Sequence, residues 1–232
     1  MALDSFTDDL TALHAVEGPS VTRFDAGPAF DGRIAVLPSA FNPPTLAHAH
    51  LLAAAASLEG LTGVAALLST RNVDKGLVGA SLAHRIGMLL AEQRTWPSLA
   101  VLATNAARLV DQGAALGQQF RGAEFDFIVG YDTLVRLFDG RYYTDMPVEL
   151  SRFFAHHRVI AANRADVTIA QVAEFIAVAG GAFADRILTL QIPGGPAALS
   201  SSQAREAVAS QSTSEALSDA VARYVSEHGL YR

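Results

Sequence analysis

Cysteine is absent from this chain of 232 residues. Disulfide frameworks, zinc–thiolate sites and cysteine nucleophiles are therefore excluded. Long apolar runs are also missing, because the most apolar stretch, residues 51–58, is too short to span a bilayer. Residues 1–10 are polar and acidic, unlike a signal peptide. We therefore expect a cytoplasmic protein that does not associate with a membrane.

Positive charge is scarce. The chain has 17 Lys and Arg against 23 Asp and Glu, a net charge of -6. So acidic a chain lacks the basic surface of a general nucleic-acid binder, and we expect no nucleic-acid partner. Any positive charge used to bind nucleotides must be concentrated in one pocket. Half of the residues are hydrophobic, which is enough to bury a full core.

Short apolar strands alternate with helices over most of the chain. Strands are predicted at 33–38, 63–69, 99–103, 125–129, 158–162 and 187–192. Helices are predicted at 45–58, 81–93 and 105–120, and residues 200–218 allow two short helices. This alternation predicts βαβ units. We expect the α/β class, with a Rossmann-like open parallel sheet and helices on both faces.

The N-terminal residues do not follow this alternation. A helical stretch at 5–16 leads into a connection rich in glycine and proline, 17–32. We therefore divide the chain into an N-terminal helical appendage, 1–32, and an α/β domain, 33–232.

The loop after the first strand has features of a phosphate site. Residues 38–48 read PSAFNPPTLAH, and ligands of an open parallel sheet bind beyond the carboxyl ends of its strands. Thr45 is a candidate N-cap, and the start of a helix attracts anions. His48, one turn further on, could reach the same anion. The alternative is a loop and helix cap with a surface histidine. His48 and His50 are two residues apart and do not converge on one metal ion.

A second candidate lies after the last predicted strand. A loop rich in glycine precedes residues 199–205, which read LSSSQAR. Serine hydroxyls, backbone N–H groups and the guanidinium of Arg205 can form a phosphate cradle. The alternative is a surface helix capped by serine.

These two segments resemble the FNPxTxGH and ISSTxIR signatures of the nucleotidyltransferase superfamily, especially the nicotinamide/nicotinate mononucleotide adenylyltransferases. The likeness covers about residues 33 to 210. It implies that Thr45 and His48 bind the ATP phosphates and stabilise charge as pyrophosphate leaves. It gives phosphate binding to Ser201, Ser202 and Arg205. Both signatures in one chain, in the expected order, are far more specific than either alone.

Some positions depart from the signatures. Ala47 replaces the usual glycine, which would let the nucleotide approach the backbone closely. Ser39 and Ala40 stand where a glycine and a serine or threonine are more usual. We still expect the two segments to contact the nucleotide. The residues assigned to this contact are Ser39, Ala40, Phe41, Asn42, Ala47, Ser200, Ser201 and Ser202.

Two further segments follow strands and resemble family segments. Lys75 resembles a phosphate-binding lysine. Arg85 resembles the arginine of an RxxM segment and is assigned to acceptor binding, together with Tyr142, Tyr143 and Trp96. Ordinary solvated basic residues are the alternative for Lys75 and Arg85. Gly130 and Asp132 resemble a GADxL segment, in which the glycine allows close approach and the acid accepts from ribose hydroxyls. Asp132 could also serve as a helix cap.

The acceptor is less defined than the reaction. Many bacterial relatives place a stacking tryptophan beyond the GADxL segment, whereas this chain has Tyr142 and Tyr143 there. The single tryptophan, Trp96, precedes the third strand; it is a candidate acceptor contact or a packing residue. The SYTxxTL segment of the bacterial nicotinate enzymes is also missing. Other superfamily acceptors therefore stay open, including phosphopantetheine, glycerol phosphate and choline phosphate, some of them used with CTP.

The resemblance implies an enzyme that transfers the adenylyl group of ATP to a pyridine mononucleotide and releases pyrophosphate. Mg²⁺ is expected with ATP, held mainly by phosphates and water, and no metal-binding residue is assigned. Two alternatives are a nucleotide-binding module with weakened catalysis and, less supported, an NAD-dependent oxidoreductase. An NAD-dependent oxidoreductase would carry a G-x-G-x-x-G after its first strand, and this chain has none there. The oligomeric state, homo-oligomer or monomer, stays open.

Overall fold

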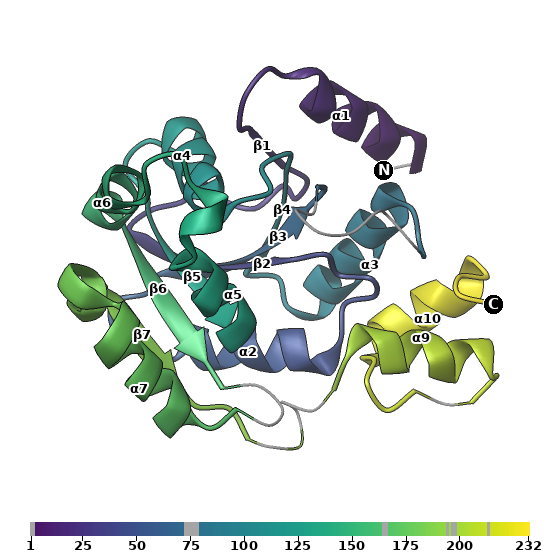
Figure 1. Cartoon of the computed structure of the whole chain (residues 1–232). Coiled ribbons are helices and arrows are strands. Elements are labelled where there is room, and N and C mark those ends of the chain that lie inside the picture. The colour runs from purple at the N-terminus through teal and green to yellow at the C-terminus, as the bar shows by residue number, and fades with distance from the viewer. Residues whose placement is uncertain (1–2, 72–78, 164–166, 194, 196–198, 213) are drawn as a thin grey trace.

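The computed structural model describes residues 3–71, 79–163, 167–193, 195, 199–212 and 214–232. At its centre lies a seven-stranded sheet of order β1-β4-β3-β2-β5-β6-β7 (Figure 1). The antiparallel edge strand is β1 (Val21–Arg23). The parallel strands are β2 (Arg33–Ser39), β3 (Gly63–Ser69), β4 (Leu99–Thr104), β5 (Glu124–Gly130), β6 (His157–Ala162) and β7 (Ile187–Leu190). The predicted α/β class and parallel sheet are confirmed.

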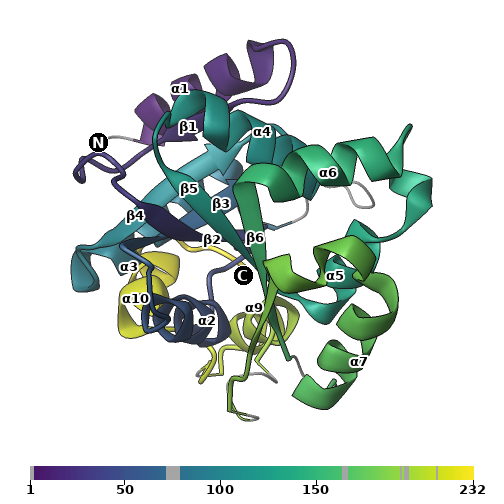
Figure 2. The ribbon, with the colours of Figure 1, turned by 90° about the vertical axis from the view of Figure 1, so that its left-hand side faces the viewer.

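Helices cover both faces of the sheet (Figures 1 and 2). One face carries α1 (Leu3–Ala15), α2 (Leu46–Ala56) and α3 (Leu82–Thr95). The other carries α4 (Leu109–Gln119), α5 (Tyr131–Leu137), α6 (Met146–His156) and α7 (Ile169–Ala179), with short 3₁₀ turns at Gly140–Tyr142 and Gly181–Arg186. Strand residues alternate between the two cores: Val36 faces α4–α7, whereas Leu37 faces α1–α3. Two covered faces explain why apolar residues occupy both faces of the strands.

The C-terminal segment forms a third small core. Helices α9 (Ser201–Ala209) and α10 (Asp219–Glu227) lie beside α3, as the yellow ribbons of Figure 1 show. Met88 of α3, Ala204 of α9 and Val221 of α10 are buried together there. This packing carries the start of α9 to the loop that follows β2.

Three predicted elements differ from the structure. Helix α4 begins at Leu109, not at residue 105, because the Asn105 side chain is bound to residues before β1. Strand β7 stops at Leu190, since the backbone of Ile192 pairs with the side chain of Asn163. Among the described residues of 200–218 there is one helix, α9; the next begins at Asp219.

The N-terminal appendage packs onto the α/β domain. Its predicted helix is α1, and the apolar side of that helix, with Phe6, Leu10 and Leu13, is buried in the core beside α3. Strand β1 was not predicted; it extends the sheet through its pairing with β4. None of the helices in the described part of the chain has the length and apolar character that crossing a bilayer requires.

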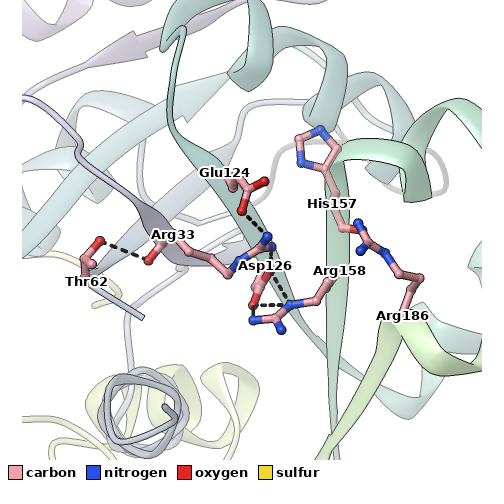
Figure 3. Close-up of polar contacts among 7 residues, drawn as sticks. All are labelled: Arg33, Thr62, Glu124, Asp126, His157, Arg158 and Arg186. Atoms are coloured by element: carbon pink, nitrogen blue, oxygen red, sulfur yellow. Dashed lines mark hydrogen bonds and ion pairs between the residues drawn. The ribbon is translucent and has the colours of Figure 1, made fainter. Parts of the chain in front are cut away.

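An ionic network joins three strands near their amino ends (Figure 3). Asp126 of β5 is fully buried and lies between Arg33 of β2 and Arg158 of β6, at N–O distances of 2.7 and 2.6 Å. Glu124 also pairs with Arg33, and the side chain of Glu124 is 57% exposed. The network links β2, β5 and β6 at the end of the sheet where these strands begin, opposite to their carboxyl ends.

Candidate active site

A cavity of about 880 Å³ opens at the carboxyl ends of the strands. It is lined by the last residues of β2, β3, β5 and β6 and by the first residues of α2, α4, α5 and α9. Strand order reverses between β2 and β5, and such a switch point is where open α/β sheets bind ligands. The volume lies within the usual range for a cofactor-sized ligand.

His48 enters this cavity from the first turn of α2. Its ring Nδ1 lies 3.0 Å from the backbone nitrogen of Thr45, which donates to it, and 2.8 Å from Thr45 Oγ1. Because Nδ1 accepts, the neutral ring carries its hydrogen on Nε2. Nε2 lies 3.1 Å from Ser39 Oγ at the end of β2. The histidine is therefore held as a donor at the cavity wall.

Thr45 lies behind this histidine. It is only 4% exposed, and it is the N-cap of α2. It contacts the small crevice beside Trp96, and it is absent from the residues that line the large cavity. The structure thus places Thr45 where it positions His48, which differs from the direct phosphate contact that the sequence suggests.

The second segment meets the first at the same cavity. Arg205 Nη1 donates to the backbone oxygen of Asn42 at 2.7 Å, and Arg205 Nη2 donates to Ser202 Oγ at 3.1 Å. Ser201 Oγ donates to the backbone oxygen of Pro43 at 2.8 Å. Both His48 and Arg205 line the cavity. Two segments that lie more than 150 residues apart in sequence are therefore docked directly onto each other.

Arg85 supplies a further cation from α3. Its Nε donates to the oxygen of Ala80 at 2.9 Å and its Nη1 to the oxygen of Ala40 at 3.2 Å. Burial lowers the pKa of this guanidinium; an arginine nevertheless stays charged. Arg85 lines the cavity near Arg205, so positive charge accumulates at this end.

The other predicted residues of the cavity come from α5 and the turn beyond it. Gly130 ends β5 and is the N-cap of α5, and Asp132 lies in the first turn of that helix. Tyr142 and Tyr143 also line the cavity. Tyr143 Oη donates to the oxygen of Leu137 at 2.7 Å, and burial raises the pKa of Tyr143 to about 12. Its phenol therefore stays a donor at neutral pH.

Known proteins resemble this chain in sequence and in fold. A "Putative nicotinamide mononucleotide adenylyltransferase" of Schizosaccharomyces pombe is 29% identical over 170 residues, which are 70% of this chain and 62% of the relative. The chain thus spans about three fifths of the length of that relative. A "Probable nicotinate-nucleotide adenylyltransferase" of Bordetella petrii is 29% identical over 206 residues, which are 86% of this chain and 99% of the relative. A scan against models of protein families finds no match.

Among solved structures, a nicotinic acid mononucleotide adenylyltransferase of Plasmodium falciparum, complexed with NaAD, has the same fold. It superposes with a TM-score of 0.66 at 16% identity, over 86% of this chain and 97% of that one. The chain is thus similar in sequence to two proteins named as mononucleotide adenylyltransferases, and it shares the fold of a third.

Most of the predicted site residues that the structure describes line the cavity, and two of them, Thr45 and Trp96, do not. Ser39, Ala40, Phe41, Asn42, Ala47, Ser200, Ser201 and Ser202 all line it. Trp96 does not; it follows the C-terminal end of α3 and lines the small crevice. Thr45 lies behind His48, as described above. Lys75 falls outside the described residues.

The cavity also holds residues that the signatures of the adenylyltransferase family did not indicate. Arg108 and Gln112 line it from the start of α4. Arg108 binds Asp111 at 2.7 Å and Glu149 at 2.9 Å, and hydrogen bonding to Asp111 raises its pKa. Gln112 is buried, and its Oε1 has no partner among the described residues. Only their position in the sequence could have indicated these two residues, since both follow the carboxyl end of β4.

Proposed function

We propose that this protein transfers the adenylyl group of ATP to a pyridine mononucleotide, nicotinamide or nicotinate mononucleotide. The products are a dinucleotide of the NAD type and pyrophosphate. The observation that carries this proposal is the meeting of His48 and Arg205 at one cavity. The relatives named above have this activity in their names, and the Plasmodium falciparum protein binds NaAD.

The geometry fits a reaction without a protein nucleophile. The phosphate oxygen of the acceptor, already ionised at neutral pH, attacks the α-phosphorus of ATP in line. The bond from the α-phosphorus to the bridging oxygen breaks, and pyrophosphate leaves with that electron pair. Catalysis then consists mainly of positioning and of neutralising developing charge. The His48 Nε2–H group and the guanidinium of Arg205 are donors suited to that task.

We propose that the two substrates bind at opposite ends of the cavity. We assign His48, Arg205 and the serines at the start of α9 to the triphosphate. Arg85, which the sequence analysis assigns to the acceptor, is proposed to serve the triphosphate as well, because it lies close to Arg205. Asp132 supplies an acceptor for ribose hydroxyls, and Tyr142 and Tyr143 line the end assigned to the acceptor base.

ATP is proposed to bring Mg²⁺ as part of the substrate, with phosphate oxygens and water as its ligands. Among the described residues, no group of three or more His, Asp or Glu side chains could hold a metal ion.

Pyrophosphate release tests the proposal directly. ATP should support turnover with nicotinamide or nicotinate mononucleotide, and the dinucleotide product should appear in equal amount. Parallel reactions should contain phosphopantetheine, glycerol phosphate or choline phosphate, and CTP should replace ATP in one arm. Turnover only with one of these other pairs would contradict the pyridine acceptor. Tight ATP binding without turnover would support a weakened module, for which Ala47 is the first position to examine.

Arg205→Ala should weaken ATP binding by about 10- to 100-fold, because a charge-assisted hydrogen bond contributes roughly 1.5–3 kcal/mol. Calorimetric titration with MgATP measures the change. Arg223→Ala is the matched control, since Arg223 is an exposed arginine of the neighbouring α10 and is not among the residues that line the cavity. Equal affinities for the two variants would argue against the second phosphate segment.

A further inference from the structure

Tyr231, near the C-terminal end of the chain, reaches the first signature loop. Its Oη donates to Asn42 Oδ1 at 2.8 Å. Helix α10 ends at Glu227, and Gly229, with φ +59, turns the chain back so that the backbone nitrogen of Leu230 bonds to Val225. Leu230 and Tyr231 then pack on the small core shared by α3, α9 and α10. The reversal thus carries the phenol to the loop between β2 and α2.

The contact fixes the orientation of the Asn42 amide. Asn42 Oδ1 accepts from Tyr231 and also from the backbone nitrogen of Ala80, at 3.2 Å. Two donors on one oxygen define which side of the amide is oxygen and which is nitrogen. Gly79 lies so close that a β-carbon there would stand 2.6 Å from Asn42 Nδ2. The Asn42 side chain is therefore held on several sides at once.

Asn42 in turn connects Tyr231 to the cationic end of the cavity. Asn42 lines the cavity, and its backbone oxygen is the acceptor for Arg205. Tyr231 is not among the residues that line the cavity, and both Arg85 and Arg205 are close enough to affect its ionisation. Burial raises the pKa of the Tyr231 phenol above its usual range, and the two guanidinium groups oppose this shift. The phenol remains protonated and can only donate to Asn42 Oδ1.

We infer that Tyr231 is a positioning residue for the triphosphate end of the cavity, acting through Asn42 on the loop that also anchors Arg205. This inference rests on the proposed function in assigning that end to ATP. It does not make Tyr231 a catalytic residue. It implies that the last helix and the turn after it contribute to nucleotide binding and do more than complete the fold.

The test removes one hydroxyl at a time from the C-terminal segment. Tyr231→Phe keeps the ring and loses the bond to Asn42. Tyr224→Phe is the matched control, since Tyr224 belongs to the same core and its hydroxyl contacts His84 Nδ1 at 3.2 Å, away from the cavity. Tyr231→Phe should weaken binding of MgATP about five- to ten-fold by calorimetry, the loss of one hydrogen bond. Tyr224→Phe should bind as the parent chain does.

Kinetic and coupling measurements separate positioning from a general loss of stability. In Tyr231→Phe, KM for ATP should rise while KM for the acceptor and the thermal midpoint stay close to the parent values. In a chain that already carries Asn42→Ala, adding Tyr231→Phe should have no further effect on ATP affinity. Equal ATP affinity of the Tyr231→Phe and Tyr224→Phe variants would overturn the inference, as would full additivity with Asn42→Ala.

The binding experiment also distinguishes this inference from the proposed function. A parent chain that binds MgATP but releases no pyrophosphate with either pyridine mononucleotide contradicts the proposed reaction. The ratio of ATP affinities between the two tyrosine variants still decides the role of Tyr231 in that case. A parent chain that does not bind MgATP at all overturns both.

Discussion

Replacing His48 by alanine is expected to lower kcat about 100- to 1,000-fold, the usual effect of removing one well-placed donor to developing charge. The Nδ1 atom of His48 is occupied by the backbone N–H of Thr45, so the donor that faces the cavity is Nε2–H. Alanine removes this donor and puts nothing in its place. Single-turnover measurement of pyrophosphate release, with both substrates saturating, reports the chemical step.

His50→Ala is the control for this experiment. His50 lies on the same helix, is exposed, and bonds only to the backbone oxygen of Leu46 among the interactions described. It should retain parental kcat. The helix loses its capping partner in His48→Ala, so the thermal midpoint of each variant should be compared before the rates. A folded His48→Ala variant with unchanged kcat would remove His48 from the mechanism.

Replacing Thr45 by alanine should have a smaller effect than replacing His48 itself. The backbone N–H of residue 45 would still hold the His48 ring after replacement by alanine, whereas the hydroxyl contact would be lost. The sequence places Thr45 correctly at the start of α2, because threonine before an apolar helix is a recognisable cap. It could not indicate that the side chain lies behind His48, since that depends on how α2 packs against the sheet.

Local patterns were sufficient for most of the parallel strands and for the two signature segments. The run from Gly63 to Ser69 is apolar except for its last residue, and β3 has those bounds. The start of α3 was equally readable, because Ser81 accepts from the backbone nitrogen of His84 as an N-cap does. By contrast, β1 has three residues in a connection rich in glycine and proline, and it becomes a strand only by pairing with β4. Tertiary pairing of this kind leaves no local signal.

Residues that act across long sequence separations were also beyond prediction. Tyr231 contacts a residue 189 positions earlier, and that contact depends on the turn at Gly229 and on the packing of α10. Arg108 and Gln112 line the cavity at the start of α4, which begins four residues later than the sequence predicts. The signatures indicated the end of the cavity proposed for the phosphates, because most of its residues are contiguous in two short segments. The rest of the cavity is assembled from single residues on several elements.

Asp126→Ala is expected to lower the free energy of unfolding by about 3–5 kcal/mol, the cost of removing one partner from a buried ion pair. The Asp126 side chain is fully buried between Arg33 and Arg158, whose side chains are only 17% and 25% exposed. Arg158 reaches both carboxylate oxygens, and Arg33 binds one of them (Figure 3). Without the carboxylate, two poorly hydrated guanidinium groups lie side by side with their mutual repulsion uncompensated. Urea unfolding followed by circular dichroism gives the difference.

Glu124→Ala provides a matched comparison, because Glu124 pairs with the same Arg33 but is more than half exposed. Water and salt screen that pair, so its removal should cost no more than about 1 kcal/mol. The free energy of the Asp126 network therefore depends on its burial, and similar losses in the two variants would contradict this explanation. The network joins the amino ends of β2, β5 and β6, whereas the cavity lies at their carboxyl ends. Asp126→Ala protein that remains folded at low temperature should therefore bind MgATP with parental affinity.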